Sequence, residues 1–348
     1  MTHKELASKF DISPTAFSLI INNKPGIAAQ TRGRVIEGLE QLGLAYLVKK
    51  AKPSAALQNL CFIIYKRHGE ILDQHPFFLL LIENIEVRAR ELGYKILLST
   101  IDKRRETGLQ IEQLNQMDAN GGIIFATEMQ QEDIALFSAV EMPCVVLDHY
   151  FPTQNINTVS INNEMGAFQA VEHLVQMGHT HIGYLKSKTR ISSFEERERS
   201  FHSAMAYFGL ALCPEYIYEV SYSEKGSNED FMQILRANPK LPTAFVTDDD
   251  TIAVGVMEAL AKHAYKIPEE ISLVGFNNRP VCNTTVPPLT SIDVSKQTFA
   301  YEAVNEVVRL IRGQEENTAE TRSRKLRMGT KLILRQSVFD RRGSGDSH

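Results

Sequence analysis

The sequence has few cysteines and no long apolar run, and both absences narrow the class of protein. The cysteines stand far apart with no C-x-x-C pair, which argues against a zinc site and a disulfide framework: Cys61, Cys144, Cys213 and Cys282. We expect reduced thiols, no metal and no cofactor. No apolar segment reaches membrane-spanning length, and the first residues lack the basic stretch and apolar core of a secretory signal. The sequence therefore predicts a cytoplasmic protein without membrane contact.

The chain also lacks the short motifs of common enzyme classes. It contains no P-loop, no G-x-S-x-G and no H-E-x-x-H. His173, His179 and His181 do not have the spacing of metal ligands, and packing or a turn explains the last two. The sequence therefore favours a binding protein over an enzyme.

Length and charge indicate more than one domain. The 348 residues exceed one ordinary core and allow two or three domains. The net charge of −4 is unevenly distributed, because residues 1–53 carry eight Lys or Arg against four Asp or Glu. A small basic segment on an acidic body is expected when only that segment contacts a polyanion such as DNA. Ordinary solvated surface charge would give the same modest excess.

Three short helices are predicted near the N-terminus, where apolar residues recur at helical spacing. A capping-box pattern of Thr2 and Glu5 opens the first helix. Ser13 can cap a second helix that starts at Pro14, a favoured first position, and residues 22–26 end it. Two helices joined by about four residues have the spacing of a helix-turn-helix, whose second helix enters the DNA major groove.

Beyond a linker, short β-rich runs alternate with amphipathic helices. The predicted strands are 60–65, 95–99, 122–125, 144–147, 181–185, 244–247 and 272–274. The predicted helices are 77–92, 110–117, 134–140, 166–177, 197–208 and 251–263. Such alternation implies parallel sheets covered on both faces, and the number of elements indicates two Rossmann-like lobes. Ligands then belong at the carboxyl ends of the strands, in the cleft between the lobes.

Ordered motifs along residues 4–340 resemble the lactose-repressor (LacI/GalR) family. The N-terminal segment carries K-E-L-A-S-K-F-D-I-S-P-T-A-F-S-L-I-I-N-N-K-P. The body carries H-P-F-F (75–78), N-G-G-I-I-F (120–125), P-C-V-V-L-D (143–148), H-L-V-Q-M-G-H (173–179) and P-E-E-I-S-L-V-G-F (268–276). A chance match of so many motifs in order is far rarer than a single hit.

The resemblance implies an all-α helix-turn-helix head and an α/β periplasmic-binding-protein-like sensor of two Rossmann-like lobes. It implies a repressor that binds near-palindromic double-stranded operator DNA as a homodimer, under the control of a sugar or anionic metabolite held between the lobes. The implied boundaries are a head at 1–45, a hinge at 46–58, a first lobe at 59–160 and 292–322, a second lobe at 161–291 and 323–340, and a disordered tail at 341–348.

The hinge departs from the family pattern. Pro53 stands about where relatives have a leucine that wedges into the minor groove, and a helix through it would lose a hydrogen bond. Leu57 is one substitute for that leucine. Alternatively, Lys49, Lys50 and Lys52 hold phosphates instead.

In the family, the second helix of the head contacts bases with side chains at its start and one turn later, which correspond to Pro14, Thr15 and Leu19. Leu19 stands where relatives usually have Arg, so we expect an apolar contact, for instance with a thymine methyl group, in place of guanine recognition. The remaining residues implied to bind DNA are Thr2, Ser13, Ser18, Asn22, Thr31 and Lys49. Helix capping or plain exposure is the alternative for Ser13 and Ser18.

The implied effector-binding residues are Phe77, Phe78, Asp148, Arg197, Asp249 and Asn277. The guanidinium of Arg197 can hold two oxygens at once, although a surface ion pair with its acidic neighbours is an alternative. Phe77 and Phe78 suit a stacking wall or the core, and Asp249 can equally cap a helix.

Asn277 suggests an unusual effector. Sugar-sensing relatives commonly have Asp at this position, and an amide accepts hydrogen bonds from two hydroxyls less well. Lys186 and Lys188 lie at a neighbouring strand end. Together these residues favour an anionic effector such as a phosphorylated sugar, unless both lysines point to solvent.

Two alternatives share part of this description. A stand-alone sugar-binding protein of the periplasmic type would have the two-lobed fold, but it needs a signal peptide and no DNA-binding head. A regulator whose sensor answers to a protein partner is the second alternative. A DNA-binding regulator is expected at the nucleoid.

Overall fold

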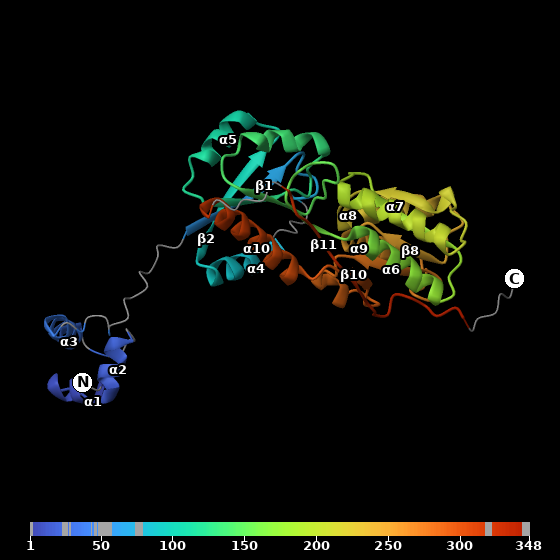
Figure 1. The fold of residues 1–348 in the computed structure, drawn as a ribbon. Helices are drawn as coiled ribbons and strands as arrows, with labels where there is room; N and C mark the ends of the chain where they lie inside the picture. The colour runs from blue at the N-terminus through green and yellow to red at the C-terminus, as the bar shows by residue number, and fades with distance from the viewer. Residues whose placement is uncertain are drawn as a thin grey trace. The chain divides into compact units, whose positions relative to one another are not determined.

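The computed structural model describes residues 3–22, 27, 29–42, 44, 47, 58–73, 79–316 and 322–342. The chain divides into two compact units, Met1–Leu57 and Gln58–His348, a helical head and an α/β body (Figure 1). The hinge residues Pro53 and Leu57 and the three lysines before them lie outside the described residues.

The head contains helices α1 (His3–Lys9), α2 (Pro14–Ile21) and α3 (Ala29–Gln41). They share one small core: Leu6, Ala7, Phe17, Ile20, Ile21, Val35 and Leu39. The predicted start of α2 is confirmed, because Ser13 has an extended backbone and its Oγ accepts the Ala16 N–H at 3.0 Å. Thr2, the other predicted cap, lies outside the described residues.

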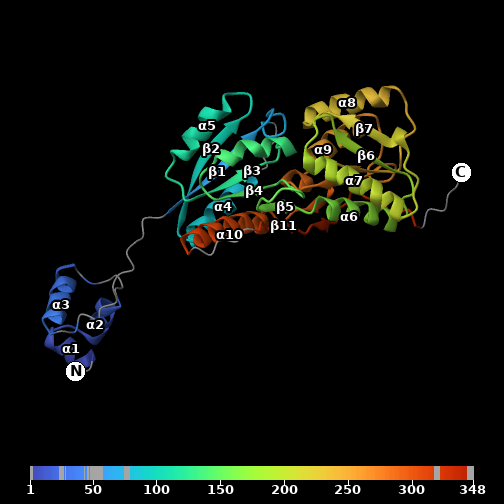
Figure 2. The same cartoon turned by 45° about the horizontal axis from the view of Figure 1, so that its top comes forward.

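The first lobe of the body is built on a parallel sheet in the order β11-β5-β4-β3-β1-β2. Its strands are β1 (Gln58–Lys66), β2 (Tyr94–Asp102), β3 (Gly121–Phe125), β4 (Cys144–Leu147), β5 (Thr158–Ile161) and β11 (Lys325–Met328). Helices α4 (Leu79–Glu91) and α10 (Lys296–Glu315) cover one face, and α5 (Thr107–Asn115) and the 3₁₀ helix Gln131–Ala139 cover the other (Figure 2). Alternate residues of β1 therefore enter opposite cores, as expected for a strand buried on both faces.

The second lobe repeats this plan with the strand order β12-β10-β9-β8-β6-β7. Its strands are β6 (Ile182–Ser187), β7 (Ile217–Val220), β8 (Ala244–Thr247), β9 (Ser272–Phe276), β10 (Thr290–Asp293) and β12 (Lys331–Ile333), of which only β12 is antiparallel to its neighbour. The covering helices are α6 (Asn163–Gln176), α7 (Ser192–Tyr207), α8 (Glu224–Arg236) and α9 (Asp250–Lys262). Side-chain caps open three of them: Asn162 for α6, Ser223 for α8 and Asp249 for α9. The two lobes confirm the predicted fold class.

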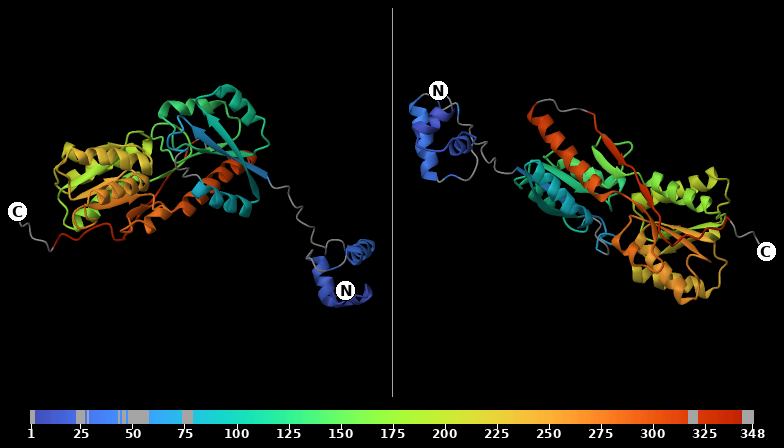
Figure 3. Two further views of the ribbon diagram at one scale, coloured as in Figure 1. Left: turned by 180° about the vertical axis from the view of Figure 1, so that it is seen from behind. Right: turned by 90° about the horizontal axis from the view of Figure 1, so that it is seen from below.

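The structure corrects the predictions from sequence at three places. β11, which the predicted boundaries assign to the second lobe, pairs with β5 of the first sheet. Asp293, placed by sequence in the first lobe, ends β10 of the second sheet, and the C-terminal segment then crosses between the lobes again (Figure 3). The helix predicted at 134–140 is a 3₁₀ helix. In the described part of the chain, no helix combines the length and the apolar character needed to span a membrane.

Candidate functional site

A small cavity lies between the lobes at the carboxyl ends of the strands. It is lined by Ile71, Leu72, Thr127, Asp148, Ile161, Ile191, Ser193, Phe194, Arg197, Tyr222, Asp249 and Asn277. Its volume is about 20 Å³, which is room for a water molecule and not for a sugar. Four predicted effector-binding residues thus meet at one cavity. Phe77 and Phe78 lie outside the described residues.

Arg197 is held rigidly in the wall of the cavity. Only 3% of its surface is exposed, and its Nε donates a hydrogen bond to Asn163 Oδ1 at 2.9 Å. Its Nη1 donates to the carbonyl of Asp248, and its guanidinium lies 3.7 Å from the centre of the Phe276 ring. The alternative of a surface ion pair is therefore wrong for Arg197. A buried guanidinium with fixed orientation can recognise a ligand oxygen.

Asp148 lies at the end of β4 and contributes a buried carboxylate. Its Oδ2 accepts the Thr127 hydroxyl at 2.6 Å. Burial raises the pKa of Asp148 to about 6, although the Thr127 hydrogen bond and the charge of Arg197 oppose that rise. At neutral pH the carboxylate is therefore mostly ionised but poorly solvated. Hydroxyl donors from a ligand would stabilise it.

Asp249 and Asn277 form a hydrogen-bonded pair at the opposite wall. Asp249 Oδ1 accepts the Thr251 N–H at 2.7 Å, so Asp249 does cap α9. Its other oxygen accepts Asn277 Nδ2 at 2.5 Å. Asn277 Oδ1 is buried and has no hydrogen-bond partner among the described residues. One N–H of the Asn277 amide is committed to Asp249, so this pair offers the cavity its acceptor oxygens and one further N–H.

The prediction that Lys186 and Lys188 add positive charge to the cleft is wrong. Lys186 Nζ lies 3.1 Å from Glu219 and 3.3 Å from Glu198. Lys188 Nζ lies 2.8 Å from Asp230, and neither lysine lines the cavity. The charges of both lysines are therefore compensated by ion pairs outside the cavity.

A further carboxylate lies just behind the cavity. Asp250 is fully buried, and its oxygens accept the Ser291 hydroxyl at 2.6 Å and the Arg279 N–H at 2.7 Å. Burial and the neighbouring charge of Asp249 raise the pKa of Asp250 to about 7. The electrostatic character of this wall is thus acidic.

In the head, α2 has one buried and one exposed face. Phe17, Ile20 and Ile21 pack into the head core. The predicted base-contacting residues Pro14 and Thr15 are exposed, and Leu19 is half-buried. The side chains available to DNA are thus those that the helix does not need for folding.

The predicted phosphate contacts of the head have local partners as well. Ser18 is exposed, and its carbonyl accepts Asn22 Nδ2 at 2.9 Å, so Asn22 closes the end of α2. Ser13 acts as the cap described above, and Thr31 is half-buried on α3. Lys49 and Thr2 lie outside the described residues. Contacts of all these residues with DNA stay predictions.

Comparison with known proteins agrees with this architecture. Residues 171–338 match the family described as "Periplasmic binding protein-like domain". The HTH-type transcriptional repressor PurR of Actinobacillus pleuropneumoniae serotype 3 (strain JL03) is 26% identical over 340 residues, which is 97% of this chain and 98% of that protein. PurR of Haemophilus influenzae (strain PittEE) is 26% identical over 341 residues, with the same coverage.

Solved structures share the fold. The Lac repressor dimer bound to operator and the anti-inducer ONPF has a TM-score of 0.70 and 23% identity, over 97% of this chain and 99% of that chain. The regulator CelR in complex with cellobiose has a TM-score of 0.69 and 19% identity, with the same coverage. Over nearly its whole length the chain is thus similar to transcriptional repressors, and it shares the fold of the Lac repressor. The relatives named above are repressors and not enzymes.

Sequence reasoning missed part of the cavity. Phe194 and Tyr222 line it, and Phe194 lies 5.5 Å from the Arg197 guanidinium. Phe194 precedes Arg197 by one helical turn, a spacing that could have identified it. Tyr222 follows β7, a strand that the sequence analysis did not find. Arg34 of α3 donates its Nη2 to the Phe10 carbonyl at 3.2 Å and joins α3 to the end of α1.

Proposed function

We propose that this protein is a repressor that binds a near-palindromic operator through α2 and responds to a neutral, hydroxyl-rich ligand held between its lobes. The observation that carries the proposal is the convergence of Arg197, Asp148 and the Asp249–Asn277 pair on one interlobe cavity. The proposed site of action is the cytoplasm, at the nucleoid.

The polarity of the cavity supports a neutral ligand. Asp148, Asp249 and the free oxygen of Asn277 are acceptors, whereas among the described lining residues Arg197 alone carries a positive charge. A sugar offers several hydroxyl donors and can also accept from the guanidinium. A phosphorylated ligand would bring its charge close to two buried carboxylates, which costs free energy. The cellobiose complex of the related regulator CelR agrees with a neutral sugar.

The lobes have to separate before such a ligand can enter. A cavity of about 20 Å³ excludes it, and direct contacts join the two lobes. Thr189 Oγ1 of the second lobe donates to Glu70 of the first, and Ser192 Oγ lies 2.9 Å from His149 Nδ1. A ligand that prefers the open arrangement shifts the equilibrium from closed lobes to open lobes. We propose that this shift alters the affinity for DNA.

An exposed apolar face of the first lobe supports a homodimer. Leu79 at the start of α4 is 57% exposed, and Leu98 on β2 is 61% exposed. Leu98 lies on the same face of β2 as Tyr94 and Ile96, which pack beneath α4. β2 is also an edge strand. An apolar face beside an open edge is a liability in a monomer, and we propose that a second copy covers it.

Thermal denaturation in the presence of ligands tests the proposal. Glucose, ribose, lactose and cellobiose are compared with glucose 6-phosphate and ribose 5-phosphate. We expect at least one neutral sugar to raise the melting temperature of the wild type, with no effect on Arg197→Lys. A rise with the phosphorylated sugars alone would overturn the neutral-ligand proposal. No rise with any compound would favour a sensor that answers to a protein partner.

Selection of bound DNA from a random library tests the other half of the function. We expect two inverted half-sites, because each head of a two-fold dimer contacts one half-site. The base pair opposite Leu19 is expected to be A·T, since leucine can contact a thymine methyl. Recovery of unrelated sequences would contradict the repressor function.

A further inference from the structure

The segment Arg67–Asp73, called here the β1 loop, forms part of the cavity wall. It follows β1, and its Ile71 and Leu72 line the cavity. The side chain of Glu128, which comes from the segment after β3, is fully buried beside the loop. Its carboxylate accepts five backbone N–H groups at 2.8 to 3.2 Å, from Arg67, His68, Gly69, Ile71 and Leu72. One carboxylate thus organises almost the whole loop.

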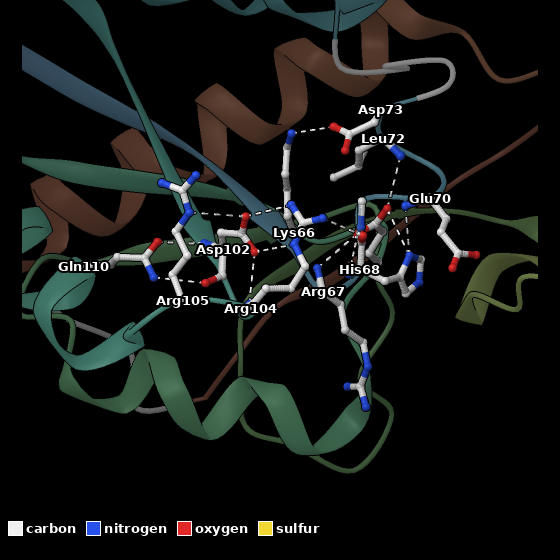
Figure 4. Close-up of polar contacts among 12 residues, drawn as sticks. Lys66, Arg67, His68, Glu70, Leu72, Asp73, Asp102, Arg104, Arg105 and Gln110 are labelled. Atoms are coloured by element: carbon white, nitrogen blue, oxygen red, sulfur yellow. Dashed lines mark hydrogen bonds and ion pairs between the residues drawn. The ribbon is translucent and has the colours of Figure 1, made fainter.

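The backbone of the loop is shaped for this convergence. Gly69 has φ +83°, and a Cβ at that position would lie 2.5 Å from Asp73 Oδ2. Only glycine adopts this conformation without strain, and a positive φ lets successive N–H groups point to one anion. Lys66 Nζ to Asp73 at 2.6 Å and Arg104 Nη1 to the His68 carbonyl at 3.0 Å brace the loop from outside (Figure 4).

The other side of the loop faces the second lobe. Ile71 is buried in a cluster with Ile191 and Phe194. Glu70, the neighbouring residue, accepts the Thr189 hydroxyl. The β1 loop is therefore fixed to the first lobe by Glu128 and contacts the second lobe with its tip.

We propose that Glu128 is a positioning residue for the ligand: it holds the β1 loop as a preformed wall of the cavity without touching the ligand itself. Glu128 is not among the residues that line the cavity. The ligand part of this inference rests on the proposed function. The structural part, that the loop depends on this carboxylate, does not.

A carboxylate is required because both sides of the group receive N–H donors. Glutamine at this position keeps one acceptor oxygen but directs its own NH₂ group at the remaining donors. At least two of the five hydrogen bonds would then be lost, and buried N–H groups without acceptors are costly. Aspartate keeps the charge but is one methylene shorter, so we expect it to restore the loop only in part.

Hydrogen exchange of the full chain without ligand tests the structural part. In the wild type we expect slow exchange at the amides of residues 68, 69, 71 and 72, although no helix or strand contains them. In Glu128→Gln these amides should exchange at least about tenfold faster, with Glu128→Asp in between. Fast exchange of these amides in the wild type overturns the proposal, even if the variants do not fold.

Asp133→Asn is a matched control. Asp133 is also a buried carboxylate, but it binds the side chains of Arg67 and Lys103 instead of the amides of residues 68–72. We expect exchange of those amides to stay within about threefold of the wild type in this variant. Equal acceleration in both variants would mean that any lost buried charge loosens the loop, and would overturn the specific role of Glu128.

Calorimetric titration tests the positioning role. The probe is the sugar of the panel above that raises the wild-type melting temperature most. We expect Glu128→Gln to raise its Kd at least about tenfold, while Asp133→Asn leaves it within about threefold at a comparable loss of stability. An unchanged Kd in Glu128→Gln refutes positioning. If no sugar binds the wild type, the proposed function fails, and the exchange result still decides the role of Glu128 in the loop.

Discussion

Replacing Asp148 by asparagine should stabilise the ligand-free protein while it removes ligand binding. Asp148 is buried, and burial raises its pKa from 3.8 to about 6. Asparagine can still accept the Thr127 hydroxyl that Asp148 accepts at 2.6 Å, but it carries no charge to desolvate. The substitution therefore isolates the cost of the charge.

The magnitude follows from the pKa. A pKa difference of one corresponds to about 1.4 kcal/mol. The rise in the pKa of Asp148 from 3.8 to about 6 therefore means that the ionised side chain costs the folded state about 3 kcal/mol. The pKa of Asp148 is higher in the folded state than in the unfolded state. Below pH 4, where the carboxyl is protonated, the folded protein therefore does not bear this cost, and the free energy of unfolding falls as the pH rises to 6. Asparagine has no such loss. The variant should thus gain about 3 kcal/mol on the wild type between pH 4 and pH 7.

Urea denaturation followed by far-UV circular dichroism measures this difference, since the chain has no tryptophan for fluorescence. Asp102→Asn is a control with the opposite pH dependence. The hydrogen bonds from Arg104 lower the pKa of Asp102 to about 2, so ionised Asp102 stabilises the folded state and this stabilisation disappears in acid. If the stability gap between wild type and Asp148→Asn does not change between pH 4 and pH 7, the buried charge is not costly and the reasoning is refuted.

Four further changes have defined outcomes. Arg197→Lys should abolish sugar binding in calorimetry, because one ammonium group cannot replace a stacked guanidinium fork; retained binding would contradict its role. Ser13→Ala should cost α2 about 1 kcal/mol, seen as faster hydrogen exchange at its first turn. Leu98→Lys should convert dimer to monomer in analytical ultracentrifugation, and an unchanged dimer would place the interface elsewhere. Ser192→Ala, which removes the contact with His149, should tighten sugar binding up to about fivefold by favouring open lobes; weaker binding would mean that the ligand closes them.

The strands that the sequence located best are short apolar runs between turn residues. β4 and β8 were predicted at their observed bounds, since each is a continuous buried run. β5 and β7 were missed because Thr158, Ser160 and Glu219 interrupt their apolar pattern. α10 was missed although its buried residues recur at helical spacing, so this helix was within reach of the sequence.

Two missed elements, β7 and α8, contributed to the error at the cavity. Lys186 and Lys188 were correctly placed at a strand end, but their charge was taken as available to a ligand. Their partners Glu219 and Asp230 belong to β7 and α8, elements that were absent from the predicted fold. A strand-end position locates a side chain only approximately. Its charge partners depend on every neighbouring element.

Glu128 shows a limit of another kind. No spacing or motif singles it out, because its role depends on the backbone of a loop about sixty residues earlier in the chain. Backbone N–H groups exist in every residue, so a sequence carries no sign of where five of them converge. Gly69 was the single available hint of this arrangement. Glycine follows strands too often to identify a loop whose N–H groups converge on one anion.

Fixing the β1 loop to one lobe also determines how the cavity opens. If the loop moved independently, a ligand could enter by displacing it while the lobes stayed together. Held by Glu128, the loop has to move with the first lobe, so entry breaks the contacts of Ile71 with Ile191 and of Glu70 with Thr189. Breaking these contacts then adds to the free energy of separating the lobes, and not to the free energy of a local loop motion. A ligand can bias the position of a whole lobe only if the wall it touches is rigidly part of that lobe.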